Sequence, residues 1–435
     1  MISLCLFSGF NLYAQVFTQS STDGSITITP KGMNGNSIPI ADSTNTALGA
    51  SALGKIENSI FVSGNTAVGT LALSSAVRAI GNTALGFGSL QKTVAGRDNV
   101  AIGAYALNGV LNGDENVGVG TATLQRNEYG SGNTAVGYYA LRITTFGFDN
   151  TAVGRRALFV NDGGSHNTAV GASALRDGRT GSNNTALGSE ALLKSGASFN
   201  TALGYQTLLS TTTGEYNTGV GMYSLRDNTI GHSNAAVGYN SLGKNTIGLR
   251  NTSVGYQAGF TITIGSNNTF LGYGADAQAG NVSNSVAIGY ETKVNASNKI
   301  RLGNNMITSI EGNVPFSVPS DRRLKQEIVY TSSLGLNFIS RLNTASYIYV
   351  HDQTQVRRNG LIAQDVEQVM KELDMEFSGL QKSPDGTYSL SYSDFVMPLI
   401  NSVKELREEN TTLRSELDEI KQRLETLIEA IENKQ

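Results

Sequence analysis

Ser320 and Lys325 are the residues of this sequence whose types and spacing could support covalent chemistry. They lie in the run Ser320-Asp321-Arg322-Arg323-Leu324-Lys325. A serine hydroxyl becomes a nucleophile when a neighbouring base takes its proton, and a lysine can act as that base when desolvation lowers its pKa. Serine–lysine pairs are a known form of such a site. In the alternative interpretation, Ser320 or Asp321 caps a helix and Lys325 is a solvated charge, and this run alone favours that alternative.

The elements around this pair must bring the two side chains together. A separation of five residues does not place two side chains on one helical face. We therefore expect Ser320 on a loop that precedes a helix carrying Lys325. After Pro315 and Pro319 glycine becomes rarer, charge rises and helical spacing begins. Further motifs follow, which are Asn359-Gly360-Leu361-Ile362-Ala363-Gln364-Asp365-Val366, Tyr388-Ser389-Leu390-Ser391-Tyr392 and the run from Phe395 to Leu399.

Together these motifs resemble the intramolecular chaperone domain of phage tail spikes and endosialidases, the peptidase S74 family, from about residue 317 onward. The resemblance implies self-cleavage, with Ser320 as nucleophile, Lys325 as base and Ser320–Asp321 as the bond that breaks. It implies a single turnover, within the chain or within its trimer, and no external substrate. Two departures are Asp365 in place of the family's usual Glu and the lack of a proline near Met370. Neither touches the proposed chemistry.

Most of the chain before this region is a repeat. The phrase Asn-Thr-Ala-Val-Gly returns with its glycine 17 residues further on, except for one gap of 20 and one of 16. Such a fixed short period predicts a stacked solenoid. Seventeen residues suffice for one or two short strands and two tight turns, so we predict a left-handed parallel β-roll of 17-residue coils over residues 45–293. At a strand spacing of ~4.8 Å, fifteen coils make a rod of roughly 65–70 Å.

The positions within one coil predict its two faces. The Val, Leu or Ile before the glycine shares a strand face with the Thr or Val three before it, and we predict that this face is the interior. A leucine four after the glycine, from Leu53 to Leu242, should close the interior from the other side. The Ala or Gly two before the glycine lies on the opposite face, which we predict to contact neighbouring chains. The Asn four before the glycine should form a stacked ladder at a corner.

The repeats resemble the heads of trimeric adhesins of the YadA type. The nearest copy is Asn284-Ser285-Val286-Ala287-Ile288-Gly289, followed by Asn298-Lys299-Ile300-Arg301-Leu302-Gly303-Asn304 and Ile310-Glu311-Gly312, which look like that family's exit from head to neck. The resemblance covers residues 45 to about 312, and it is specific in phrase and weaker in period. It implies three parallel chains and a binding or adhesive role.

A heptad pattern ends the chain. Its seam positions are Val396, Leu399, Val403, Leu406, Asn410, Leu413, Leu417, Ile420, Leu424, Leu427 and Ile431. The alternating spacing of 3 and 4 residues predicts a parallel coiled coil over residues 396–433. A helix packed within one chain is the alternative. The seam does not decide between two and three strands, so the homotrimer comes from the resemblances.

The whole sequence thus predicts a mainly β, trimeric protein that ends in a small α/β domain and a coiled coil. Its predicted parts are a signal peptide (1–14), an N-terminal cap (15–44), the β-roll (45–293), a neck or linker (294–316), the chaperone domain (317–395) and the coiled coil (396–433). Residues 1–14 are apolar and contain the single cysteine, Cys5. A signal peptide implies export. A buried N-terminal strand is the alternative for this segment.

Composition and charge exclude several functions. The net charge of −3 and the lack of a basic stripe argue against nucleic acid as a partner. After residue 14 there is no run of 18 apolar residues, so we expect no membrane span in the mature chain. His166, His232 and His351 lack ligand spacing, so we expect no metal and no cofactor. Tyrosines after the glycine could bind glycans, although packing between coils or chains is the favoured interpretation.

We therefore expect an exported, secreted or cell-surface fibre of adhesin or tail-fibre type, with a glycan or host-surface ligand on the β-roll. A phage-derived fibre particle is the alternative origin. A glycan-degrading tail-spike enzyme is the alternative function. It requires paired carboxylates, and the acidic residues of 45–293 are sparse and irregular. In a third interpretation, cleavage releases a functional C-terminal part and the roll is discarded.

Overall fold

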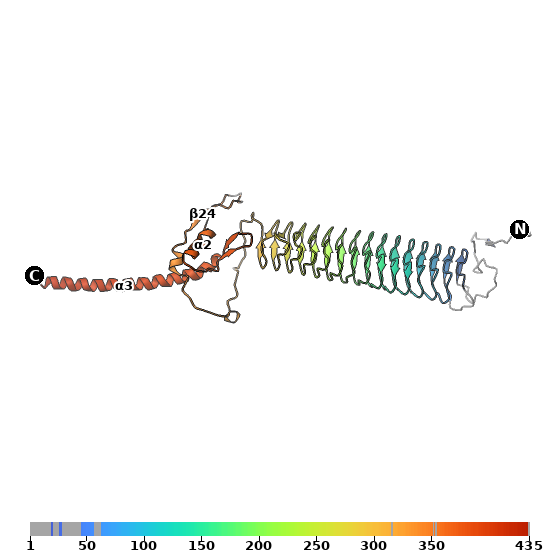
Figure 1. Ribbon diagram of the computed structural model, residues 1–435, viewed down its shortest axis with the longest axis horizontal. Helices are drawn as coiled ribbons and strands as arrows, with labels where there is room; N and C mark the ends of the chain where they lie inside the picture. Colours follow the sequence, from blue (N-terminus) through green and yellow to red (C-terminus); the bar gives the residue numbers. More distant parts are fainter. Residues whose placement is uncertain are drawn as a thin grey trace, which may run out of the picture. The chain divides into compact units, whose positions relative to one another are not determined.

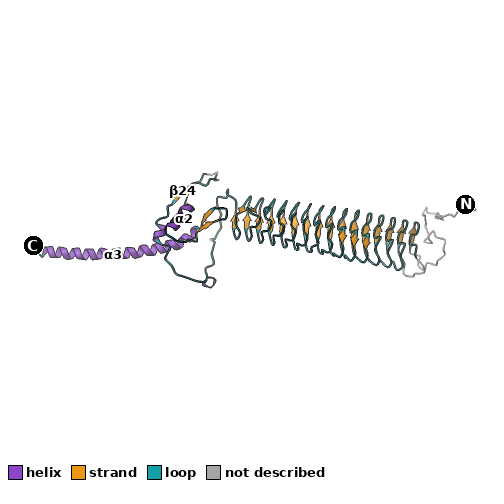
Figure 2. Cartoon of the chain, in the orientation of Figure 1, coloured by secondary structure: helices purple, strands orange, loops and turns teal. Residues whose placement is uncertain are grey.

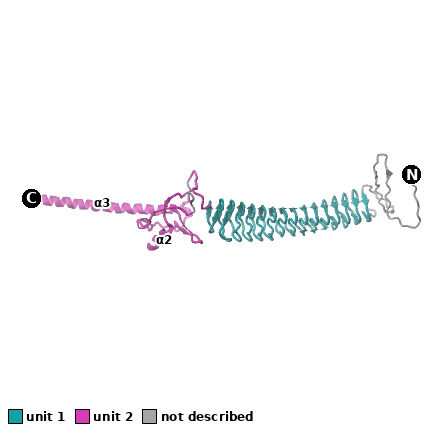
Figure 3. Cartoon of the chain, turned by 90° about the horizontal axis from the view of Figure 1, so that it is seen from above, with its two compact units in different colours: residues 1–303 teal, residues 304–435 magenta. Residues whose placement is uncertain are grey.

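The structure is a computed structural model that describes residues 45–55, 62–314, 316–350, 352 and 355–433, and two short strands nearer the N-terminus. These are β1 (Gln19–Ser20) and β2 (Ile26–Thr27), which pair antiparallel. The predicted signal peptide lies outside the described residues, as does the predicted cap apart from β1 and β2. The chain forms two compact units, one up to Gly303 and one from Asn304 (Figure 3).

Unit 1 is a parallel β-solenoid, as the repeat predicts (Figures 1 and 2). Each coil adds one three-residue strand, and equivalent residues pair in register, as in Thr151 with Thr168. The sixteen-stranded sheet runs through β3 (Thr46–Leu48), β4 (Thr66–Val68), β5 (Thr83–Leu85), β6 (Val100–Ile102), β7 (Val117–Val119), β9 (Thr134–Val136), β11 (Thr151–Val153), β13 (Thr168–Val170), β14 (Thr185–Leu187), β15 (Thr201–Leu203), β16 (Thr218–Val220), β17 (Ala235–Val237), β18 (Thr252–Val254), β19 (Thr269–Leu271), β21 (Val286–Ile288) and β23 (Ile300–Leu302). Its last strand therefore lies inside the segment predicted as a neck.

The rest of each coil is turns, with short strands in some coils. A three-stranded parallel sheet comprises β8 (Arg126–Asn127), β10 (Ile143–Thr144) and β12 (Val160–Asn161). A two-stranded sheet comprises β20 (Asp276–Ala277) and β22 (Lys293–Val294). These pairings also join equivalent positions of successive coils. The coil is therefore the unit of both structure and sequence.

The prediction of which strand face is the interior was wrong. The alanine two before the glycine is completely buried in most coils, as in Ala101 and Ala169. The branched residue one before the glycine faces outward, and it is 36–46% exposed in Leu48, Leu85, Ile102, Val136, Leu187, Val237, Val254, Leu271, Ile288 and Leu302. The larger residue was assigned to the interior because apolar residues tend to be buried, but that tendency does not require every large apolar residue to be inside. The small-residue face is consequently not a surface for other chains.

The interior is too narrow for two large side chains to meet. The leucine four after the glycine is buried, as predicted, from Leu73 to Leu242. At Gly118, which replaces the alanine, an added Cβ would collide with Leu107 Cδ1. At one place the large and the small side chain are exchanged. Gly259 occupies the position of the buried leucine, and Phe270 occupies the position of the buried alanine in the next coil. An added Cβ on Gly259 would lie 2.8 Å from the Phe270 ring, so the swap conserves volume.

The glycine of the phrase is required by two constraints. Gly171 has φ +131°, and an added Cβ would lie 2.6 Å from the backbone carbonyl of Gly188 in the next coil. Only glycine combines that backbone conformation with such a close approach. The same arrangement recurs from coil to coil, which explains why the residue repeats without substitution from Gly49 to Gly289.

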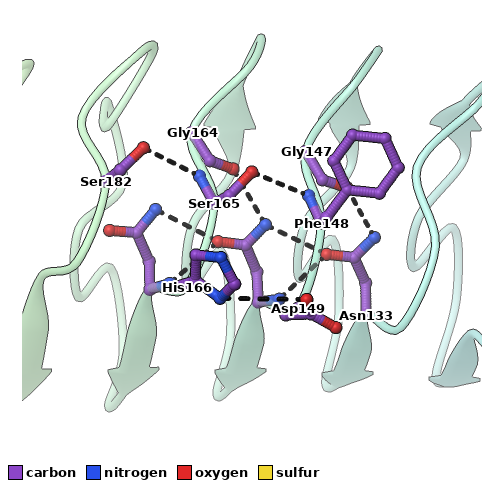
Figure 4. Close-up of polar contacts among 10 residues, drawn as sticks. Asn133, Gly147, Phe148, Asp149, Gly164, Ser165, His166 and Ser182 are labelled. Atoms are coloured by element: carbon purple, nitrogen blue, oxygen red, sulfur yellow. Dashed lines mark hydrogen bonds and ion pairs between the residues drawn. The ribbon is translucent and has the colours of Figure 1, made fainter.

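The asparagines form the predicted ladder. The backbone N–H of Asn150 donates to Asn133 Oδ1 at 3.1 Å, and the Asn150 side-chain amide donates to the same oxygen at 3.0 Å. The Asn133 amide also donates to the Gly147 carbonyl at 2.8 Å (Figure 4). These side chains are buried, and an unpaired amide there would be costly. In the ladder, the buried polar groups at the corner of each coil thus gain hydrogen-bond partners from the asparagine of a neighbouring coil.

Unit 2 contains short elements and one long helix. They are η1 (Arg322–Leu324), α1 (Leu336–Ile339), β24 (Ala345–Tyr347), β25 (Arg358–Gly360), α2 (Ala363–Glu372), β26 (Leu380–Lys382), β27 (Tyr388–Leu390), η2 (Tyr392–Phe395) and α3 (Val396–Glu432). β24 pairs with β25 and β26 with β27, both antiparallel. A small core consists of Phe338, Val366, Val369, Phe377 and Phe395. It packs α1 and α2 against Phe395 of η2, which leads directly into α3.

Candidate functional site

Asp321 begins the single helical turn that carries the predicted chemistry. It is the N-cap of η1, and its Oδ1 accepts a hydrogen bond from the Arg323 backbone N–H at 2.8 Å. The Arg323 guanidinium also donates to both carboxylate oxygens, at 3.1 Å to Oδ1 and at 2.6 Å to Oδ2. These bonds from Arg323 lower the pKa of Asp321. The helix cap considered as an alternative is therefore present.

The serine and the lysine nevertheless meet. Lys325 Nζ donates to Ser320 Oγ at 2.7 Å. Ser320 lies just before the turn, as expected. Lys325 does not lie within a helix, because η1 ends at Leu324 and Lys325 is its C-cap, with extended backbone. The expectation of a helix carrying Lys325 was therefore wrong, since one tight turn is enough to fold the lysine side chain back onto Ser320.

The segment that holds this pair is exposed along its whole length in the single chain. All described residues from 316 to 333 are exposed. Several of them are apolar, and Phe316 and Tyr330 retain 93% and 87% of their accessible surface. Val318, Leu324 and Val329 are exposed as well. An uncovered apolar segment of this kind is typical of a surface that another molecule covers.

The two downstream motifs meet one another in the folded body of unit 2. Tyr392 Oη accepts a hydrogen bond from the Leu361 backbone N–H at 2.8 Å. Gly360 lies so close to Tyr392 and Tyr347 that an added Cβ would collide with the hydroxyl of Tyr392. Hydrogen bonding with Tyr349, with burial, raises the pKa of Tyr347 to about 12. These residues build the fold rather than the serine–lysine pair.

A polar contact also fixes α1 to α3. Glu405 Oε2 accepts a hydrogen bond from the Leu336 backbone N–H at 2.7 Å. The Asn401 side-chain amide donates to the Leu334 carbonyl at 3.1 Å. The first turn of α1 lacks a side-chain cap of its own, so Glu405 satisfies it from another helix. The start of α3 is thereby part of the folded domain.

Beyond that start, the seam of α3 lies open. From Leu406 onward its apolar members are 48–62% exposed, in Leu406, Leu413, Leu417, Ile420, Leu424, Leu427 and Ile431. A helix of 37 residues whose apolar stripe is exposed beyond its first turns is unusual in a single chain. The alternative of a helix packed within one chain is wrong for this stretch, and the coiled coil stays a prediction.

A row of stacked tyrosines runs along the surface of the solenoid, one from each of several successive coils. Rings of Tyr239, Tyr256, Tyr273 and Tyr290 stack on one another, with successive centroids 4.9–5.4 Å apart. Tyr205 and Tyr223 extend the series with edge-on contacts. The ring faces are thus turned toward neighbouring coils, where a sugar ring could not stack on them. Packing between coils is the role that these contacts support.

A second ladder escaped the sequence analysis. Ser165 Oγ accepts a hydrogen bond from the Phe148 backbone N–H at 3.1 Å, and the Ser165 N–H donates to Ser182 Oγ at 3.1 Å (Figure 4). Ser266 and Ser283 repeat the arrangement further on. The signal was a serine two residues before the asparagine in many coils. It was hidden because other coils have Asp114 or Phe148 there.

Other candidate sites have little support. Among the described residues, no group of three or more His, Cys, Asp or Glu side chains could hold a metal ion. His166 lies 3.8 Å from Asp149, both exposed, and His232 contacts Ser233. His351 lies outside the described residues. In the described part of the chain, no helix is both long and apolar enough to cross a membrane.

Comparison with known families identifies part of unit 2. Residues 320–375 match the Peptidase_S74 family, described as the chaperone of endosialidase. The match begins at Ser320 and includes Lys325 and the motif from Asn359 to Val366. No curated protein matches the chain. A chaperone-of-endosialidase segment after a β-solenoid fits a protein of tail-fibre or tail-spike type. The likeness to YadA-type heads stays a prediction.

Proposed function

We propose that this chain is an exported, fibre-like protein of adhesin or tail-fibre type, and that it works as a homotrimer. Its C-terminal region assists trimer assembly and β-roll folding and then separates by self-cleavage at Ser320–Asp321. The observation that carries the proposal is the 2.7 Å contact between Lys325 Nζ and Ser320 Oγ, at the start of the segment that matches the chaperone of endosialidase.

Two exposed apolar surfaces support association between copies. One is the outward column of Val, Leu and Ile along the solenoid, and the other is the seam of α3. Both continue over many turns, whereas exposed apolar residues on a monomer are usually scattered. The solenoid column is the surface that we now assign to neighbouring chains, in place of the alanine face.

The order of assembly follows from chain topology. A coiled coil forms from local contacts, while a long parallel stack must align each coil on the one before it and exposes edges meanwhile. Three α3 helices that associate first would bring three solenoid sequences together in register. The chaperone role proposed for unit 2 therefore needs no contact with an external client.

Cleavage would depend on the same assembly. Lys325 can accept the serine proton only as a neutral amine, and desolvation favours the neutral form of a lysine. The pair is exposed in one chain, so burial must come from other copies. This dependence would delay cleavage until the fibre has formed.

Electrophoresis under denaturing conditions tests the proposal. The assembled wild type should lose the 115 residues 321–435, and Ser320→Ala and Lys325→Ala should stay intact. Lys325→Arg, which retains a charge but has no accessible neutral form, should also stay intact. Arg322→Ala alters the same turn and leaves the pair in place, so it should still be cleaved. Full-length wild type after trimer assembly would reject the self-cleavage.

No specific observation in the described residues favours the alternative of a glycan-degrading enzyme. Asp276 is the one buried carboxylate among the described residues, and its oxygens are occupied by Thr261 and the Ala277 backbone N–H. A glycan or host-surface ligand for the roll, and a cell-surface or phage-particle location, remain part of the proposal. Glycan binding can be measured on the S320A trimer with an array of immobilised glycans.

A further inference from the structure

The position of the serine relative to the bond that it should break imposes a constraint. Ser320 supplies the carbonyl of the Ser320–Asp321 bond, so its own hydroxyl is attached to the same residue. Attack within that residue would close a ring of only Oγ, Cβ, Cα and the carbonyl carbon. The bond angles of such a β-lactone are far from their relaxed values, and strain grows steeply with angular deviation. Ser320 therefore cannot readily cleave after itself.

One easier attack exists within the chain, but it breaks another bond. The hydroxyl of Ser320 can reach the carbonyl of Pro319, because that ring also includes the amide nitrogen and is nearly unstrained. The product would be cut between Pro319 and Ser320. Its C-terminal fragment would be 320–435, with 116 residues, in place of 321–435, with 115. The two routes can thus be told apart by mass.

We propose that Ser320 of one copy attacks the Ser320 carbonyl of a neighbouring copy, so that each cleavage site combines residues of two chains. This inference rests on the proposed self-cleavage at Ser320–Asp321. The nucleophile and its base come from one chain, because Lys325 Nζ lies 2.7 Å from Ser320 Oγ within the chain. The neighbour contributes the bond that breaks. In a closed ring of three, every copy gives one nucleophile and receives one.

The step balances without a further reactant other than water. Lys325 as the neutral amine takes the Ser320 proton, and Oγ forms a bond to the neighbour's Ser320 carbonyl carbon. The bond from that carbon to the Asp321 nitrogen breaks, and the lysine ammonium returns the proton to this nitrogen. An ester then joins the two chains. Water hydrolyses it, which restores the hydroxyl and leaves a carboxylate at the cut end.

The exposed segment provides the surface for such a meeting. Phe316, Val318 and Ser320 alternate in a segment without helix, and alternate residues of an extended chain share one face. Leu324, which follows Ser320 in the chain, is 72% exposed. Packing of this face on a second copy would bury the apolar side chains and bring Ser320 close to its counterpart. It would also exclude water from the lysine.

Mixed trimers test the inference. Wild-type chains and Ser320→Ala chains carry different tags after the predicted signal peptide, are co-expressed so that they assemble together, and are purified on both tags in turn. The purified trimers then contain both kinds of chain. If attack is between copies, about two thirds of the Ser320→Ala chains in these selected trimers should be cut after residue 320 by a wild-type neighbour at equal mixing. Trimers of Ser320→Ala alone are the control and should stay intact.

The outcomes separate this inference from the proposed function. Mixed trimers in which wild-type chains are cut and Ser320→Ala chains stay whole would overturn the attack between copies. A C-terminal fragment that begins at Ser320, found by mass spectrometry, would also overturn it in favour of attack on Pro319. Wild-type chains that stay intact in assembled trimers would reject the self-cleavage itself.

Discussion

Among single residues, Asp276 combines deep burial with an ionisable group. It lies on β20 in the solenoid interior, where Thr261 Oγ1 donates to it at 2.6 Å. Burial raises the pKa of Asp276, and the hydrogen bonds from Thr261 and Ala277 offset part of that effect. An acid with a raised pKa in the fold binds a proton more readily folded than unfolded. Its charge therefore reduces stability at neutral pH.

We predict that Asp276→Asn unfolds at a temperature higher by roughly 2 °C at pH 7. The asparagine oxygen can keep both backbone N–H donors, and its amide can donate to the Thr261 hydroxyl. The difference from wild type should shrink as the pH falls through the raised pKa of Asp276, because the wild type then regains stability. Thermal unfolding followed by circular dichroism between pH 7 and 4 measures this. A difference that grows in acid would contradict the assigned direction.

The asparagine ladder makes a second prediction for single residues. Asn167 Oδ1 accepts from the Asn184 backbone N–H and side-chain amide, and the Asn167 amide donates to Asn150 and Gly181. Asn167→Ala removes the partners of the buried Asn184 backbone N–H and Gly181 carbonyl in the following coil, whereas Asn150 Oδ1 keeps the Asn167 backbone N–H. We expect a loss of about 2–5 kcal/mol in unfolding free energy, measured in denaturant.

Thr168→Ala is the matched control for Asn167→Ala. Thr168 is the next residue in the same coil, and its side chain is exposed on β13. Its replacement should change the unfolding free energy by less than about 0.5 kcal/mol. Equal losses in the two variants would mean that the ladder is not what stabilises the corner.

Among the elements, α3 offers the clearest test of association. Leu413 and Leu424 are each 56% exposed in the single chain, so lysine at both positions should cost an isolated helix little. In a coiled coil the two charges would be buried at seam positions. In an S320A background, we expect Leu413→Lys with Leu424→Lys to shift the mass by light scattering toward the 45.9 kDa of one chain. Thr412→Lys, outside the seam, should retain the oligomer.

For the whole solenoid, the repeat predicts that complete coils can be removed. Deletion of residues 134–184 removes three periods of 17 and joins Asn133 to Thr185, which continues the phrase. The shortened chain should fold, with unit 1 shorter by roughly 14 Å in small-angle X-ray scattering. Deletion of residues 134–176, which is not a multiple of the period, should expose the alanines and cause aggregation. Equal tolerance of both deletions would contradict the register.

The solenoid was predictable because its constraints repeat in every coil. The spacing of glycine and asparagine predicts the strands, the register and the ladder, since each corner solves the same problem. The inside face was not predictable from Ala101 and Ile102 alone. The larger apolar side chain, Ile102, is the one expected to be buried, whereas Ala101 is buried and Ile102 is exposed. The interior is set by the width left beside Leu107, which only the folded coil defines. Gly259 in place of leucine and Phe270 in place of alanine are the sign of that width in the sequence, because a small residue at one position accompanies a large residue at the other.

The candidate site was less accessible to prediction. A separation of five residues along the chain does not fix the distance between the Ser320 and Lys325 side chains. From the sequence, their pairing is therefore implied only by the resemblance, and the turn of η1 is what brings the two side chains together. Asp321 was expected as part of the cleaved bond, and its ion pair with Arg323 was not foreseen. The contact of Tyr392 with Leu361 joins residues far apart in the sequence. Such long-range contacts leave no local pattern.

The last strand of the solenoid bears on whether one solenoid can stack end to end on another. At β23 the ladder position is occupied by Lys299, whose Nζ donates to Asn295 Oδ1 at 3.0 Å, and the preceding coil already has Ser285 in place of asparagine. A lysine offers no amide oxygen to a further coil, and charges at a sheet edge discourage pairing. This edge of the sheet is thus a poor template for the first coil of another solenoid. End-to-end stacking of solenoids is thereby disfavoured, and the number of coils in one stack stays the number encoded by one chain.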